Sequence, residues 1–422
     1  MAIYSAWALF VGVALLMLGV GLQGSLLGLR ATTEGFDVFT IGLVMSAYYG
    51  GFIAGSWGTS ELVRQVGHIR VFAALASLTS TTILLHATFV NPAAWLVIRF
   101  VAGFSVAGLF VIAESWLNHT ATNQTRGKIL SIYTIITYAA MALGQLLLNL
   151  ADPNGFILFI VVSVLVSISL IPISLTTQAA PPIDRPRAIS LVDLYRASPL
   201  GLTGCFATGV GQGALFSLAA VYAVLRGFDI SSTSLFLALP LVGVVLSQYP
   251  IGALSDRFDR RQVLMALSIL IALAALANGL MADLPLLWQM VAITGLGALA
   301  LPLYSLAISH MNDNIESDQM LGASAKLVLV YGIGSALGPM AVSLVMVAVG
   351  ARGFFWSLAA VYLALGLFAL FRMTQSKPVP LEEQGDFVLV GTRPSPVVAN
   401  VAMEIGEEGG ETPDAPDFAD TA

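Results

Sequence analysis

Long apolar runs recur along most of this chain, and they constrain its fold more than any other feature. Between residues 6 and 373 each run is roughly 20 residues long, enough for an α-helix to cross a hydrocarbon core about 30 Å thick. Hydrophobic residues make up 57% of the sequence and charged residues 10%, a balance at which a water-soluble domain would aggregate. We therefore predict an all-α membrane protein.

The runs predict twelve transmembrane helices. These lie at about 6–29, 39–60, 70–90, 93–118, 128–150, 155–176, 200–225, 233–252, 262–281, 285–309, 320–347 and 352–373. The longest polar stretch between them, residues 177–199, contains three prolines and leaves six helices on either side. We expect an N-terminal six-helix bundle over residues 1–176, a cytoplasmic linker over 177–199 and a C-terminal six-helix bundle over 200–373.

The basic residues predict the orientation, because Lys and Arg are retained on the cytoplasmic side. With the N-terminus inside, the outer loops hold three basic residues, Arg30, Arg226 and Arg352. The inner segments hold thirteen: Arg64, Arg70, Arg126, Lys128, Arg185, Arg187, Arg196, Arg257, Arg260, Arg261, Arg372, Lys377 and Arg393. We therefore expect a multi-pass protein of the bacterial inner (plasma) membrane with both termini cytoplasmic.

The C-terminal segment, residues 374–422, is acidic. Ten acids and two bases give it a charge of -8, and since the whole chain carries -6, the remainder is near +2. Its charge and its Pro and Gly content predict a disordered cytoplasmic tail. The chain has no basic patch of the kind that binds nucleic acid, so we expect no nucleic-acid partner.

An internal repeat relates the two halves. The sequence Glu-Gly-Phe-Asp-Val at 34–38 returns as Arg-Gly-Phe-Asp-Ile at 226–230, an offset of 192 residues. Upstream, the small residues and glutamine of 19–24 match those of 209–213 at nearly the same offset. Two parallel six-helix repeats form an architecture of alternating-access transporters.

The loop after the eighth predicted span reads Gly-Ala-Leu-Ser-Asp-Arg-Phe-Asp-Arg-Arg over residues 252–261. It resembles the signature loop of the major facilitator superfamily, which implies that Asp256, Arg257 and Arg260 hold the two halves together on the cytoplasmic side, with the aspartate facing a helix N-terminus. In the first-half counterpart Arg64 stands at the aspartate position. We therefore expect this contact to be asymmetric.

The fourth predicted span carries two ionisable residues. Arg99-Phe100-Val101-Ala102-Gly103 is similar to the superfamily's span-four arginine motif, and Glu114 follows. Fifteen residues place Glu114 about 22 Å from Arg99 along a helix and about 60° around it, so both can face one cavity. Ionisable groups inside a span are functional candidates, with burial against a partner as the alternative, and for Arg99 snorkelling is an equal alternative.

The order of Glu114, a loop with Arg126-Gly127, and Gly144-Gln145-Leu146 is similar to sugar porters of the superfamily. There the glutamate and arginine help to close the inner gate, which implies gating or proton coupling for Glu114 and gating for Arg126. Residues 99–147 with 334–339 resemble a YcaD-like bacterial branch. The sugar porters' glutamine pair in span seven is absent here.

Polar residues within the predicted spans are our candidates for substrate binding, and Tyr138 and Gln145 lie nearest to mid-membrane. Tyr138 and Gln145 lie on one polar stripe of the fifth span, together with Thr134 and Asn149. The full set is Gln23, Arg99, Tyr138, Gln145, Gln212, Tyr222, Tyr304 and Tyr331. Hydrogen bonding between helices is the alternative role for each of them.

Together these features predict a secondary transporter that moves a small solute through a central cavity by alternating access, with proton coupling as an option. A passive facilitator or a non-transporting receptor or scaffold remains the alternative. We expect no enzymatic activity and no cofactor, and a monomer in the lipid bilayer. His86 and His310 are isolated, so we expect no metal site.

Overall fold

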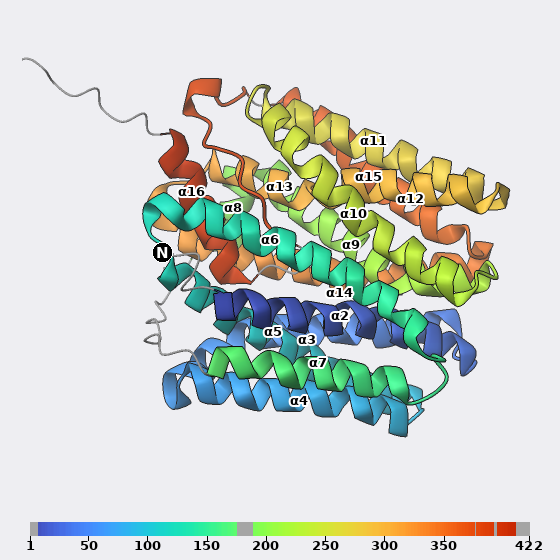
Figure 1. Ribbon diagram of the computed structural model, residues 1–422. Helices are drawn as coiled ribbons and strands as arrows, with labels where there is room; N and C mark the ends of the chain where they lie inside the picture. The colour runs from blue at the N-terminus through green and yellow to red at the C-terminus, as the bar shows by residue number, and fades with distance from the viewer. Residues whose placement is uncertain (1–6, 175–188, 376, 392–394, 411–422) are drawn as a thin grey trace, which may run out of the picture.

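The computed structural model describes residues 7–174, 189–375, 377–391 and 395–410, and in these residues the regular structure is helical, without strands (Figure 1). The first half comprises α2 (Trp7–Thr33), α3 (Val38–Val66), α4 (His68–Thr88), α5 (Pro92–Thr120), α6 (Asn123–Leu146), η1 (Leu147–Leu150) and α7 (Ile157–Ser174). A short helix, α8 (Leu191–Ala197), precedes the second half. That half comprises α9 (Pro199–Leu225), α10 (Ile230–Ser255), α11 (Arg260–Leu280), η2 (Met281–Asp283), α12 (Leu286–Ala300), α13 (Leu303–Asn312), η3 (Ser317–Gln319), α14 (Met320–Val349) and α15 (Gly353–Met373), followed by η4 (Leu381–Glu383) and α16 (Pro396–Gly410).

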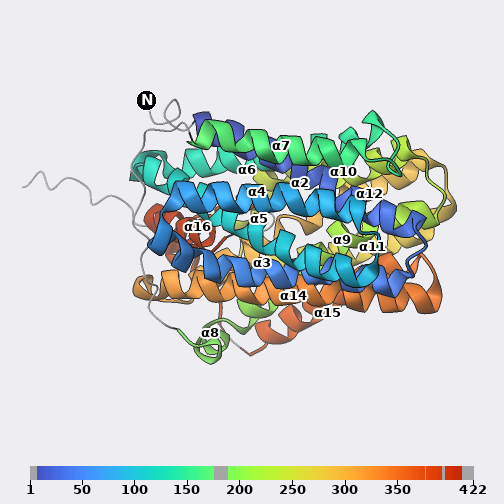
Figure 2. The ribbon, with the colours of Figure 1, turned by 90° about the horizontal axis from the view of Figure 1, so that it is seen from below.

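The long helices run roughly side by side along one axis, as expected for a bundle that spans a membrane (Figures 1 and 2). Among the described residues eleven helical segments are long and apolar enough to cross a bilayer, with α12 and α13 counted as one. The sixth predicted span corresponds to the shorter apolar helix α7. The predicted fold class is confirmed. We call the end where α8 and α16 lie, on the left of both figures, the linker end, and the opposite end the far end.

The sequence repeat marks the same turn in each half. Gly35 and Gly227 adopt φ values of 79° and 75°, a left-handed conformation that favours glycine. The aspartates that follow are helix N-caps: Asp37 accepts the Thr40 amide at 3.0 Å and Asp229 accepts the Ser232 amide at 2.8 Å. The Thr40 and Ser232 hydroxyls also hydrogen-bond to these carboxylates. The hydroxyl hydrogen bonds first, and the amide hydrogen bonds after them, lower the pKa of each carboxyl.

Close helix contacts depend on glycines at a few positions. A Cβ on Gly334 of α14 would lie 2.3 Å from the Phe206 carbonyl oxygen, and one on Gly209 of α9 would lie 2.2 Å from the Tyr331 carbonyl oxygen. The small-residue face of α14 is therefore what lets it approach α9 so closely.

The two halves meet along α2 and α9, α3 and α14, and α6 and α10. At the far end Asn149 donates a hydrogen bond to the Ser234 hydroxyl at 2.7 Å and accepts one from Ser231 at 2.9 Å. Asn149, at the end of the predicted polar stripe, thus joins the first half to the second. The two halves are therefore in direct contact at the far end.

The expectation of a disordered tail from residue 374 onward is wrong for residues 395–410. Their helical part, α16, lies at the linker end and packs against α5 and α6 of the first half and α13 and α14 of the second. Figure 2 shows α16 at the linker end of the bundle. The Pro-rich part of the linker with Arg185 and Arg187, the tail residue Arg393 and residues 411–422 lie outside the described residues.

Candidate functional site

A helix break in the second half brings three of the predicted binding residues together. Pro302, which has no amide hydrogen, separates α12 from α13. The Gln212 side chain donates to the carbonyl oxygens of Ala300 and Leu301 at 3.3 and 3.2 Å and thereby satisfies backbone groups at the break. Its own oxygen accepts a hydrogen bond from the Tyr331 hydroxyl at 3.0 Å.

Tyr304, just beyond the break, completes this cluster. Its ring centroid lies 4.6 Å from that of Tyr331. Its hydroxyl is buried, and within the described part of the chain no hydrogen-bond partner reaches it. Tyr362, which the sequence did not single out, lies nearby, since a Cβ on Gly211 would be 2.2 Å from the Tyr362 hydroxyl. We call Gln212, Tyr304, Tyr331 and Tyr362 the tyrosine cluster.

Gln145 lies at the interface between the halves. It accepts a hydrogen bond from Ser25 of α2 and lines a cavity with Phe216 of α9 and Pro240 of α10. The cavity offers about 20 Å³ to a water-sized sphere, room for about one water molecule. No solute fits at this point in the conformation described here.

The remaining predicted binding residues lie elsewhere. Gln23 and Tyr138 are buried on α2 and α6. Arg99 is buried near the far end, with its guanidinium carbon 4.5 Å from the centre of the Tyr48 ring. Tyr222 packs among aromatic rings at the far end, 4.9 Å from the ring centroid of Phe355, an arrangement that suits packing.

Glu114 is buried on α5 towards the linker end. Its carboxylate accepts a hydrogen bond from the Tyr133 hydroxyl at 2.5 Å. Ser395, from the C-terminal segment, hydrogen-bonds to the same carboxylate. Arg126, the expected partner of Glu114 at an inner gate, instead pairs with Glu404 of α16 at 2.9 Å, although Glu114 and Arg126 line the same small cavity.

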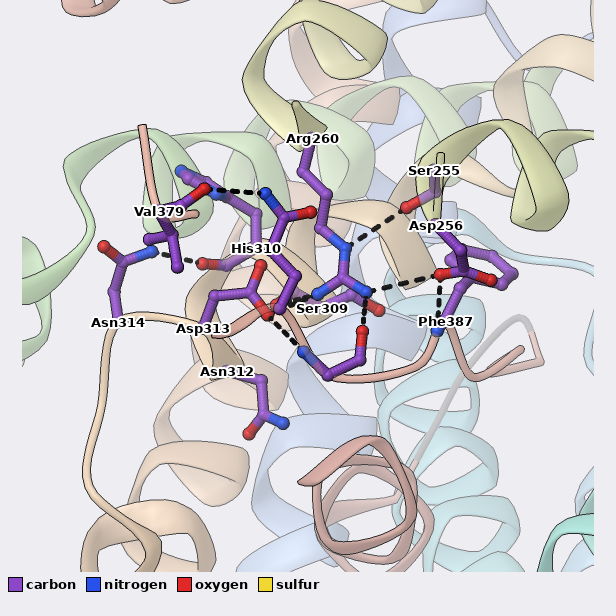
Figure 3. A network of polar contacts seen from close by, with 12 residues as sticks. Ser255, Asp256, Arg260, Ser309, His310, Asn312, Asp313, Asn314, Val379 and Phe387 are labelled. Carbon is purple, nitrogen blue, oxygen red and sulfur yellow. Dashed lines mark hydrogen bonds and ion pairs between the residues drawn. The ribbon is translucent and has the colours of Figure 1, made fainter. Parts of the chain in front are cut away.

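The second-half signature loop forms a buried ionic network around Arg260 (Figure 3). Arg260 is 1% exposed and pairs with Asp313, whose side chain is 2% exposed, and with Asp256 at 3.4 Å. It also donates to the Ser309 carbonyl at 3.3 Å. Burial raises the pKa of Asp313 to about 6, against the opposing effect of Arg260, and burial likewise raises the pKa of Asp256.

The other arginines of the two signature loops make different contacts from Arg260. Arg257 lies exposed at the surface. In the first-half loop Arg64 pairs with Glu61, three residues earlier on the same helix. The two loops therefore make different contacts: the second-half loop reaches Asp313 and the C-terminal segment, whereas the first-half ion pair is local.

Sequence reasoning missed Ser25, Tyr133 and Tyr362. It also missed Ser305 of α13, whose hydroxyl accepts a hydrogen bond from the Val390 amide at 2.9 Å. Ser and Tyr are frequent at helix interfaces. Only the rotation of each helix about its axis brings Ser25, Tyr133 and Ser305 to their polar partners and places the Tyr362 hydroxyl beside Gly211. Pro302 offers the one available signal, because a proline within an apolar span marks a discontinuous helix, and such helices form binding sites in transporters. Among the described residues no group of His, Cys, Asp and Glu could hold a metal ion.

Comparison with known proteins identifies the family. Residues 9–246 and, in a second match, residues 225–403 match the model of the Major Facilitator Superfamily. An uncharacterized MFS-type transporter YcaD of Escherichia fergusonii is 28% identical over 82% of this chain and 90% of its own length. An uncharacterized MFS-type transporter of Enterobacter sp. strain 638 is 27% identical over 88% of this chain and 97% of its own length.

Solved structures show the same fold. The nucleoside transporter NupG, as a D323A mutant, superposes with a TM-score of 0.74 at 13% identity, covering 87% of this chain and all of NupG. A bacterial homolog of the human lysosomal transporter Spinster, in an inward-facing and unoccupied conformation, gives a TM-score of 0.66 at 15% identity, covering 98% of this chain and 99% of that one.

Proposed function

This chain belongs to the major facilitator superfamily of secondary transporters, and we propose that it carries a small uncharged solute through a cavity between its two halves by alternating access. The linker end, where the basic loops gather, is the cytoplasmic side in this proposal, with both termini there. The relatives are bacterial MFS-type transporters, and eleven helical segments among the described residues of this chain are long and apolar enough to cross a bilayer, in keeping with a multi-pass protein of the inner membrane.

The observation that carries the proposal is the tyrosine cluster at the break between α12 and α13. A buried tyrosine hydroxyl without a partner, beside an amide held by backbone carbonyls, offers hydrogen bonds to a ligand at a discontinuous helix. The groups of the cluster are all neutral. Because a buried charge needs a charged or strongly polar partner, this supports a neutral solute with hydroxyl, amide or ring groups.

Gln145, Gln23 and Tyr138 would complete the solute's contacts from the first half when the halves separate around the cavity. In the conformation described here, Asn149 and the serines of α10 join the two halves at the far end. Transport requires these contacts to break as the linker end closes, which is the rocking motion of two repeats about a central site.

Glu114 is the candidate for gating or proton coupling. It is a buried carboxylate in a span, and its tyrosine partner offers only a neutral hydrogen bond. Glu114→Gln keeps the shape and the hydrogen bond but removes the titratable proton. We expect it to abolish the pH dependence of uptake if the residue carries protons, and to alter the rate at every pH if it acts as a gate. Unchanged uptake over a pH series would exclude both roles.

The test of the proposal starts with ligand binding. Purified protein in detergent is screened by thermal unfolding against neutral metabolites, because a ligand that binds the folded state raises the melting temperature. We expect a hit that is lost in Tyr304→Phe and Gln212→Leu but kept in Arg257→Met, which changes an exposed loop residue. Hits that survive both cluster variants would contradict this site.

Reconstituted vesicles then separate the alternatives. Accumulation of the hit compound against its gradient would identify a coupled transporter, and counterflow without accumulation would identify a passive facilitator. Absence of both fluxes, with binding intact, would favour a receptor.

A further inference from the structure

The C-terminal segment enters the space between the two halves at the linker end. Residues 385–391 and α16 contribute fully buried side chains, among them Val390, Ala399 and Met403. Residue Thr134, beside which the segment passes, is eleven positions into α6, about 16 Å from the start of that helix. The segment therefore reaches well into the bundle.

Backbone hydrogen bonds hold the first part of the segment to the second half. The Phe387 amide donates to Asp256 at 2.9 Å, and the Val390 amide donates to the Ser305 hydroxyl of α13 at 2.9 Å. The Gly385 amide donates to Asp313 at 3.2 Å, and Arg260 donates to the Gly385 carbonyl. Figure 3 shows the segment against this network.

Contacts on the other side join the segment to the first half. A Cβ on Gly391 would lie 3.8 Å from the Thr134 methyl group. Ser395, 0% exposed, contacts Glu114, and Glu404 pairs with Arg126 at 2.9 Å. The segment thus contacts both halves.

We propose that the linker-end space between α5, α6, α13 and α14 is a peptide-binding site whose occupant is this chain's own segment, residues 385–391 with 395–407, and that this segment is a self-inhibitory plug. The plug fills the route that a solute must take at the linker end. It also separates helices that must approach each other when that end closes, so it holds the protein in one conformation until it leaves. The inhibitory part of this proposal rests on the transport function proposed above.

The ion pair that holds the plug to the first half is weak enough to break. The plug's only described ion pair with the first half, Arg126 with Glu404, is partly exposed, with side chains 19% and 39% accessible. Exposed ion pairs are weak and screened by salt. The Asn312 amide donates to the Met403 carbonyl at 2.9 Å, a neutral contact that water can replace. The Ser317 hydroxyl donates to the Glu407 carboxylate at an exposed position, where water can also take its place.

The experiment measures access to the plugged space without any substrate. Cys205, the chain's single cysteine, is replaced by serine, and Thr134→Cys supplies the one thiol. Thr134 donates only to a carbonyl of its own helix, so its replacement leaves the plug contacts in place. A membrane-impermeant maleimide is added to the linker side of the protein in vesicles, and the labelling rate is measured.

We expect slow labelling of this parent protein and at least about tenfold faster labelling in Arg126→Glu and in Glu404→Arg. The double variant with the charges exchanged should return towards the parent rate. Glu382→Arg makes the same charge change on an exposed residue before the plug and serves as the matched control, with the parent rate expected. Met403→Asp, which puts a charge on a buried plug residue outside the membrane helices, should also accelerate labelling.

Rapid labelling of the parent, or equal rates in the parent and all variants, would overturn the plug. Because labelling needs no solute, its result is independent of the transport proposal. Once a solute is known, the plug variants should also raise its initial uptake rate. If the plug variants label faster but no solute is transported, the segment binds as proposed and the transport function is refuted. If they label faster but the uptake rate of a known solute is unchanged, the segment binds as proposed and its inhibitory role is refuted.

Discussion

Removing Arg260 is the sharpest test of how the linker end is held together. Arg260→Met keeps the length of the side chain but removes its charge and its hydrogen bonds to Asp313, Asp256 and the Ser309 carbonyl. Breaking a buried ion pair from one side costs about 3–5 kcal/mol, because the remaining charge stays buried without compensation. An unfolding entropy of about 0.9 kcal/mol/K, from about 2.1 cal/mol/K per residue over 422 residues, converts this into a fall of about 3–6 °C in melting temperature.

The effect should depend on pH through Asp313. Its folded pKa of about 6 lies above the ordinary 3.8 because burial disfavours the charged carboxylate, with Arg260 acting in the opposite direction. Such a group contributes stability below its unfolded pKa, and this contribution is lost as the pH rises through about 6. Without Arg260 the folded pKa of Asp313 rises further, so the carboxyl stays protonated to higher pH. The destabilisation is therefore largest at about pH 7.5 and shrinks towards about pH 5.

Cys205 provides the assay. It is the chain's only cysteine and is fully buried in α9, so a thiol-reactive dye reports unfolding in detergent. Arg257→Met, at an exposed position three residues earlier, should melt within about 1 °C of the wild type. Adding Asp313→Asn to Arg260→Met should recover most of the loss, since no buried charge then remains unpaired. An Arg260→Met protein with the wild-type melting temperature at pH 7.5 would refute this reasoning. So would a difference in melting temperature that grows towards pH 5.

The same dye checks three further expectations. Gly51→Ala should destabilise by about 1–3 kcal/mol or more, because its Cβ would lie 1.8 Å from the Phe100 carbonyl oxygen and must push α3 from α5. Its neighbour Gly50→Ala, with the nearest atom at 3.7 Å, should be tolerated, and equal losses in the two would contradict this. Arg352→Ala should cost under about 1 kcal/mol, because its pair with Asp283 is 41% and 65% exposed, and a larger loss would show that the far end depends on this pair.

The spans and the repeat could be predicted from the sequence because each rests on a local requirement. A hydrocarbon core fixes the length of an apolar run, and this needs no knowledge of neighbouring helices. The repeated Gly-Phe-Asp has an equally local cause: Gly35 and Gly227 supply the positive φ, and the aspartates cap the next helix.

The candidate binding residues could be predicted only in part, because an apolar helix gives no strong sign of which face is buried in protein. Their position within the spans makes Gln212, Tyr304 and Tyr331 candidates, and the structure brings them together through the break at Pro302. The same criterion predicts Tyr222, yet this residue lies among phenylalanines. The position of a residue along a span can be predicted from the sequence. The direction in which its side chain points around the helix axis depends on how the helices pack.

The prediction of a disordered tail fails at α16 for a different reason. Composition tells whether a segment can bury enough apolar surface by itself, and residues 374–422 cannot. The buried face of α16, with Ala399 and Met403, obtains its burial from helices of both halves instead. Segments that fold against a preformed surface are outside what composition can predict.

The plug also gives a physical reason for the difference between the two signature loops. In a symmetric transporter both loops would join the halves. Here, among the ion pairs of the described residues, Arg64 pairs within its own helix, whereas Arg260 of the second loop pairs with Asp313 beyond α13. The C-terminal segment accepts hydrogen bonds from and donates them to that second loop, and through Glu404 it reaches Arg126 in the first half. We infer that the segment supplies the connection between halves that the first loop lacks. If so, Arg126→Glu and Arg260→Met weaken one shared connection. In the Thr134→Cys protein, the two changes together should then raise the labelling rate by less than the product of their separate effects.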